Sequence, residues 1–158
     1  MPLFEDDTLR RRAVAEALAI LARRDHTEAE LVRKLGRKGF DPSACEAAVA
    51  RCREMGYLDD ARTVRMMTAS LRRRGLGIHR IRSELRSKGV KQTTIEDLTA
   101  ADDDPDRALE AARAALERKR PAFERESDPA KRRAKIYRFL LSRGFPADIA
   151  RRLAEKTE

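Results

Sequence analysis

The chain has few of the residues on which most binding sites and membrane segments depend. It lacks tryptophan, and aromatic residues make up only 4% of its 158 positions, too few to predict a surface that stacks the bases of single-stranded nucleic acid. No apolar run approaches the roughly 20 residues of a membrane span. The charged N-terminus, Met1 to Arg12, lacks the apolar core of a secretion signal. These absences predict a soluble, cytoplasmic protein that contacts no membrane.

Cysteine and histidine are equally scarce, with two of each. Cys45 and Cys52 fall on one helical face, about 10 Å apart by the rise per residue, too far for a disulfide. We expect them in the core. His26 and His79 have no neighbouring ligand set, so no zinc site is expected. No glycine-rich phosphate loop and no nucleophile–base pair is present, so the sequence predicts neither an enzyme nor a cofactor.

Charged residues are abundant: they make up 40% of the chain, nearly as much as the 41% that are hydrophobic. The net charge is +9 and the pI is near 10.1. A core built from this composition is thin. Much of the apolar share is alanine, which favours closely packed helices over a wide sheet or a ligand-sized cavity. The same composition is compatible with disorder, but the regular spacing of the aliphatic residues argues against it. The positive charge indicates a polyanionic or acidic partner.

One short pattern occurs three times, with its glycines about 50 residues apart. Two aliphatic residues lie four apart on one helix face, and a glycine follows four residues later, preceded by a basic residue. A glycine there ends a helix, because it enters the left-handed conformation at little cost. We therefore expect positive φ at each glycine and a buried leucine in each copy. The copies are Leu31, Leu35 and Gly39; Ile81, Leu85 and Gly89; and Ile136, Leu140 and Gly144.

The spacing predicts an all-α protein of three tandem three-helix repeats, about nine helices, arranged as an elongated, curved, monomeric array. The repeats would cover residues 1–57, 58–104 and 105–158. Thr27 to Glu30 is typical of a capping box, and Asp41 with Pro42 is typical of a helix start. Asp102 to Asp104 is interpreted as a boundary that caps the next helix rather than as a metal site. Asp128 opens a helix, after a loosely specified connection over residues 119–127.

Four segments are the most specific motifs of the chain: Leu21 to Leu31, Lys38-Gly39-Phe40, Gly56 to Ala61 and Phe139 to Phe145. In this order and at these spacings they resemble the RecX family of regulatory proteins, which modulate the recombinase RecA, and the resemblance covers essentially the whole chain. Thr63-Val64 is a minor departure, where the family usually has a second small residue. The resemblance implies three tandem three-helix repeats without catalytic activity. It also implies binding in the groove of the RecA filament on single-stranded DNA, with inhibition of filament growth, ATP hydrolysis and strand exchange, and so a role in DNA repair and recombination.

Basic residues lie on helix faces turned away from the aliphatic residues, where they would contact a partner. Arginine dominates, and its planar group matches carboxylates and phosphates. A regulator lying along an acidic filament and a sequence-nonspecific DNA-binding protein both fit these faces, and weak direct DNA binding is compatible with either. Charge does not separate the two hypotheses, and only the family resemblance favours the regulator. The candidate partner-binding residues are Arg72, Arg73, Arg74, Arg82, Arg86, Lys131, Lys135 and Arg138.

Overall fold

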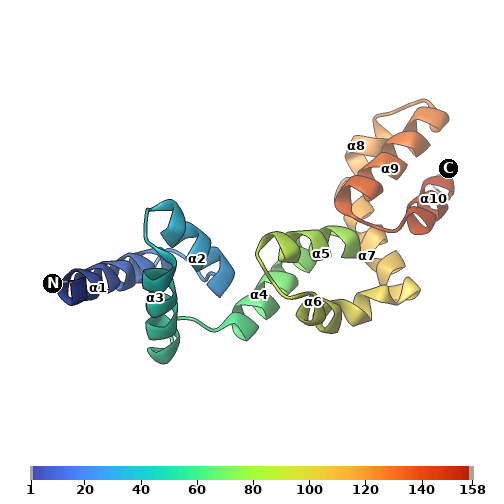
Figure 1. Cartoon of the computed structure of the whole chain (residues 1–158). Coiled ribbons are helices and arrows are strands. Elements are labelled where there is room, and N and C mark those ends of the chain that lie inside the picture. Colours follow the sequence, from blue (N-terminus) through green and yellow to red (C-terminus); the bar gives the residue numbers. More distant parts are fainter. Residues whose placement is uncertain (1, 157–158) are drawn as a thin grey trace. The chain divides into compact units, whose positions relative to one another are not determined.

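The computed structural model describes the backbone of residues 2–156 and the side chains from residue 6 onward, and every regular element in it is a helix. The all-α prediction is therefore confirmed (Figure 1). The elements up to the second repeat's first helix are α1 (Pro2–Leu21), α2 (Glu28–Arg37), α3 (Pro42–Glu54) and α4 (Asp60–Arg73). The rest are α5 (Ile78–Ser87), α6 (Gln92–Thr99), the 3-10 helix η1 (Ala100–Asp103), α7 (Pro105–Glu117), α8 (Arg120–Glu124), α9 (Pro129–Arg143) and α10 (Ala147–Glu155).

The connection expected over residues 119–127 contains a short helix, α8, which makes ten α-helices in the described residues rather than about nine. Phe123 explains why this segment is ordered. Its side chain is 7% exposed, and its ring meets that of Phe139 edge-on with centroids 5.3 Å apart. This contact between buried Phe123 and partly buried Phe139 anchors the short helix to α9.

The helix starts follow the capping residues that the sequence indicates. Thr27 and Glu30 form a complete capping box at α2. The Asp41 carboxylate accepts from the Ala44 N–H at 2.9 Å, and the Asp128 carboxylate accepts from the Ala130 N–H at the same distance. Asp104 caps α7 in the same way. These side chains satisfy backbone donors that have no partner inside the helix.

The chain folds as two compact units. The first contains the residues up to Met66 together with Lys88–Val90, and the second contains Met67–Ser87 and the residues from Lys91 onward. In the first unit α1 packs on α3 through small side chains such as Ala13, Ala17 and Ala48, with Cys45 and Cys52 buried beside them. In the second unit α9 and α10 lie side by side and pack on α7 (Figure 1). Alanine and cysteine in the first core allow the close helix packing expected from the composition.

The repeated pattern has the structural meaning that its spacing predicts. Leu35, Leu85 and Leu140 are each fully buried. Gly39, Gly89 and Gly144 have φ of +91°, +74° and +89°. Both expectations are confirmed: each middle helix, α2, α5 or α9, buries its leucine and ends at a left-handed glycine.

The segments that contain Gly89 and Gly144 make contacts between repeats, each within one unit. In the first unit the Thr27 hydroxyl, at the start of α2, donates to the Lys88 carbonyl at 2.7 Å. In the second unit the Gly77 N–H, at the start of α5, donates to the Arg143 carbonyl at 2.8 Å, and the His79 N–H donates to the Gly144 carbonyl at 3.0 Å. In both cases the segment that ends a middle helix contacts the start of the middle helix one repeat earlier.

Candidate partner-binding surfaces

Two of the candidate arginines are engaged within the protein. The Arg72 guanidinium donates to the Asp102 carboxylate at 3.1 Å and to the Leu98 carbonyl at 2.8 Å. Arg82 donates to the Thr99 hydroxyl at 2.9 Å and to the Asp103 carboxylate at 2.8 Å. The acidic segment before α7 therefore supplies counter-charges for α4 and α5, a use that the sequence analysis did not identify.

Six candidates present their charge to solvent. The exposed side chains that form no ion pair within residues 6–156 are those of Arg73, Arg74, Arg86, Lys131, Lys135 and Arg138. Long cationic side chains of this kind are ordinary solvated surface when they are isolated, but they can also meet acidic or phosphate groups without first breaking an internal pair.

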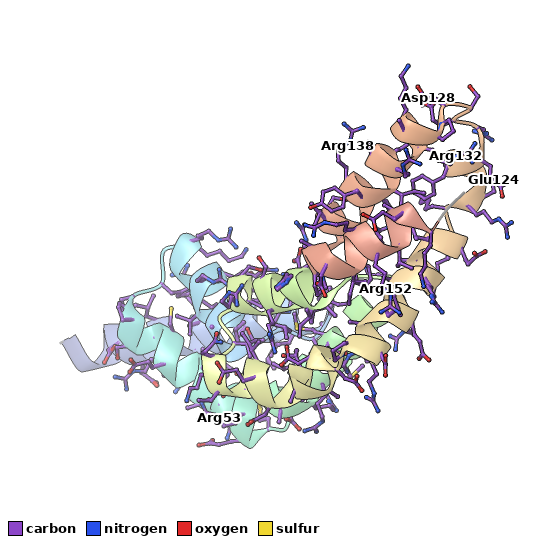
Figure 2. The ribbon with its side chains drawn as sticks, turned by 90° about the vertical axis from the view of Figure 1, so that its right-hand side faces the viewer. Arg53, Glu124, Asp128, Arg132, Arg138 and Arg152 are labelled. Carbon is purple, nitrogen blue, oxygen red and sulfur yellow. The ribbon has the colours of Figure 1, made fainter. Side chains whose placement is uncertain are left out.

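The clearest basic face is on α9. Lys131, Lys135 and Arg138 are exposed there, whereas Ile136 and Leu140 on the opposite side are 1% and 0% exposed. Figure 2 shows Arg138 extending away from the α9 ribbon. The Lys135 ammonium donates to the Ala122 carbonyl at 3.0 Å, a neutral partner that leaves its charge uncompensated. The division into a basic and an aliphatic face agrees with the sequence pattern.

A buried carboxylate, that of Glu30, organises the first unit; the sequence predicted its capping contact but neither its burial nor its ion pairs. Glu30 is 5% exposed and pairs with Arg24 at 3.0 Å and with Lys88 at 2.9 Å. Its second oxygen accepts from the Thr27 N–H at 3.2 Å. Burial alone raises the pKa of Glu30, but the hydrogen bonds from Arg24, Lys88 and Thr27 outweigh it and lower the pKa to about 2. The ionised carboxylate thus ties the segment after α5 to the start of α2.

A hollow of about 420 Å³ opens on the same unit. The alanine-rich composition predicted no ligand-sized cavity, so this hollow was not expected; most of the residues that line it have long basic side chains. The sequence signal that could have indicated it is the concentration of basic residues around α2. The lining residues are Ile20, Arg23, Arg24, His26, Lys34, Arg37 and Lys38.

The part of the chain that the structure describes contains no candidate metal cluster and no candidate membrane span. Among those residues no three His, Cys, Asp or Glu side chains gather closely enough to hold a metal ion. Within the same residues no helix combines the length and the apolar character needed to cross a membrane.

The three repeats match three family models in order. Residues 13–52 match the first three-helix domain of RecX, residues 59–98 match the second, and residues 106–153 match the third. The chain belongs to the RecX family. Regulatory protein RecX of Cronobacter sakazakii is 40% identical over 144 residues, which cover 85% of each chain. That of Deinococcus radiodurans is 38% identical over 140 residues, covering 89% of this chain and 65% of the relative.

Solved RecX structures have the same fold. A crystal structure of regulatory protein RecX matches 98% of this chain and 76% of its own with a TM-score of 0.76 at 18% identity. The crystal structure of RecX from Lactobacillus salivarius matches 95% of this chain and 97% of its own with a TM-score of 0.73, also at 18% identity. The expected architecture of three tandem three-helix repeats is therefore confirmed.

Proposed function

We propose that this RecX family protein binds the RecA filament on single-stranded DNA and inhibits RecA ATP hydrolysis and strand exchange. It would thereby regulate DNA repair and recombination, as a monomer in the cytoplasm, without a cofactor and without catalysis of its own. The observation that carries the proposal is the ordered match of all three RecX domains along the chain, together with relatives named as regulatory proteins.

Exposed positive charge supports a contact of this kind. The α9 residues Lys131, Lys135 and Arg138 share one face. Three tandem repeats offer several weak contacts to a polymer whose surface also repeats, and linked weak contacts add by avidity. We assign the binding role chiefly to the six candidates without internal ion pairs, which include Lys135. Arg72 and Arg82 would contribute mainly by holding the Asp102–Asp103 segment in place.

Charge reversal on the α9 face tests the proposal. In a RecA ATPase assay on single-stranded DNA, the double variant Lys131→Glu/Arg138→Glu should need about tenfold or more protein for half-inhibition. Loss of two charge-assisted contacts is the physical reason. Circular dichroism should show an unchanged helical signal, because both side chains are exposed.

A matched control uses an exposed arginine on α7 of the same unit, Arg113. Arg113→Glu alters net charge in the same direction, so any general charge effect appears in it as well. Equal loss of inhibition per charge reversed in the α9 variant and in the Arg113 variant would contradict a specific role for the α9 face.

A further inference from the structure

The hollow in the first unit gathers more positive charge than neighbouring acids neutralise. Five cations line it, and two of them have acidic partners: Arg24 pairs with Glu30 at 3.0 Å and Lys38 with Glu16 at 2.8 Å. The remaining three form no ion pair within residues 6–156. These three are Arg23, Lys34 and Arg37.

Lys34 is held in place by a neutral group. Its ammonium lies 2.8 Å from Nε2 of His26, and Nδ1 of the same ring lies 2.9 Å from the Arg24 carbonyl. An ammonium only donates, so Nε2 must accept and Nδ1 must carry the proton. The imidazole is 1% exposed and neutral in this arrangement, and it fixes Lys34 without compensating its charge. Burial and then repulsion by Arg24 lower the pKa of Lys34, so a bound anion would stabilise its charged form.

We propose that this hollow binds the sugar–phosphate backbone of single-stranded DNA, with Lys34, Arg37 and Arg23 donating to phosphate oxygens. An anion brought among three uncompensated cations removes their mutual repulsion and gains charge-assisted hydrogen bonds. The site lies in the first repeat, whereas the surface assigned to RecA contact lies in the second unit. The inference does not rest on the proposed regulation of RecA, because it concerns DNA alone.

The lining favours a nucleotide backbone over an acidic peptide. Ile20 and the aliphatic parts of the lysine and arginine side chains give the hollow apolar walls beneath its charged groups. A sugar can pack against such walls while its phosphate reaches the cations, and successive phosphates supply one negative charge each. The volume of about 420 Å³ lies within the roughly 300–1,000 Å³ range of ligand sites. A single side-chain carboxylate would leave most of that space unfilled.

Histidine NMR on the full-length protein gives a direct readout, since the chain has only two histidines. His26 lines the hollow, and His79 is exposed on α5 in the other unit, where it serves as an internal control. A short oligothymidylate added without RecA should shift the imidazole signals of His26 and leave those of His79 nearly unchanged. Polyglutamate at the same charge concentration should shift His26 much less.

Substitutions of the lining cations test whether lost affinity comes from lost DNA contacts or from unfolding. Lys34→Gln should weaken oligothymidylate binding about tenfold and make the salt dependence shallower by about 0.7 in log–log slope, as expected for one lost phosphate contact. Arg37→Gln should also weaken binding. Because the Arg37 side chain is exposed, this substitution should not unfold the protein, so a loss of affinity would report a lost DNA contact. Arg65→Gln, an exposed cation on α4, is the matched control.

Three results would overturn the inference. They are oligothymidylate binding that leaves the His26 signals unmoved, polyglutamate shifting them as strongly as DNA, and Arg65→Gln losing as much affinity as Lys34→Gln and Arg37→Gln.

Discussion

Gly144 and Gly39 end equivalent helices but should tolerate alanine very differently. Their φ values are nearly equal, +89° and +91°. An added Cβ at Gly39 would find open space, whereas one at Gly144 would overlap the backbone nitrogen and Cβ of Arg80. The pair therefore separates the cost of a left-handed residue from the cost of disturbing the contact between repeats.

The stability cost of alanine at each position follows from the atoms around it. Alanine in the left-handed conformation costs about 1 kcal/mol at either position. At Gly144 the start of α5 must also move away, which weakens the hydrogen bonds from Gly77 N–H to the Arg143 carbonyl and from His79 N–H to the Gly144 carbonyl. Each contributes about 0.5–1.5 kcal/mol net. We expect a loss of about 3 kcal/mol for Gly144→Ala against about 1 kcal/mol for Gly39→Ala.

Urea denaturation followed by circular dichroism measures both variants on the full chain. The larger loss for Gly144→Ala should come with a folded baseline equal to that of the unsubstituted protein. Equal losses in the free energy of unfolding for the two variants would refute the reasoning, because the close approach of α5 to Gly144 would then contribute nothing to stability.

Three further predictions concern stability. The pKa of Glu30 is lowered from 4.5 to about 2, so the ionised carboxylate should stabilise the fold fully above about pH 5 and lose this effect toward pH 2. The free energy of unfolding should fall by up to about 3 kcal/mol over that range. Urea denaturation of Glu30→Gln should lack this pH dependence. Leu140→Ala should cost about 2–5 kcal/mol in urea denaturation, because the side chain is fully buried; a loss below 1 kcal/mol would contradict its place in the core. Arg82→Ala should lower the free energy of unfolding by about 1 kcal/mol, since Thr99 and Asp103 lose a partner, whereas exposed Arg86→Ala should leave thermal unfolding unchanged.

Local signals in the sequence predicted most of the secondary structure. Thr27 caps α2 and Gly144 ends α9 because each acts on backbone groups within a few residues. Leu35 and Leu85 were predicted to be buried for a similar reason, since the 3.6-residue period places them on the aliphatic face of their own helix.

Contacts between distant segments were not predicted. Glu30 meets Lys88 across 58 residues, and Arg72 meets Asp102 across 30, so no helical period relates the partners. The hollow beside His26 combines the end of α1 with α2, and no local sequence pattern specifies how these two segments pack. The helix α8 was missed because its order depends on Phe123 packing against Phe139, not on a cap or a period.

The central claim is that the protein acts on the RecA filament and not by covering DNA. The most direct measurement is RecA ATP hydrolysis on long single-stranded DNA, with this protein added at levels far too low to coat that DNA and with its binding to the bare DNA measured in parallel. The account predicts strong inhibition at those low levels. Inhibition that appears only as the bare DNA becomes saturated would show competition for phosphate and would contradict the account.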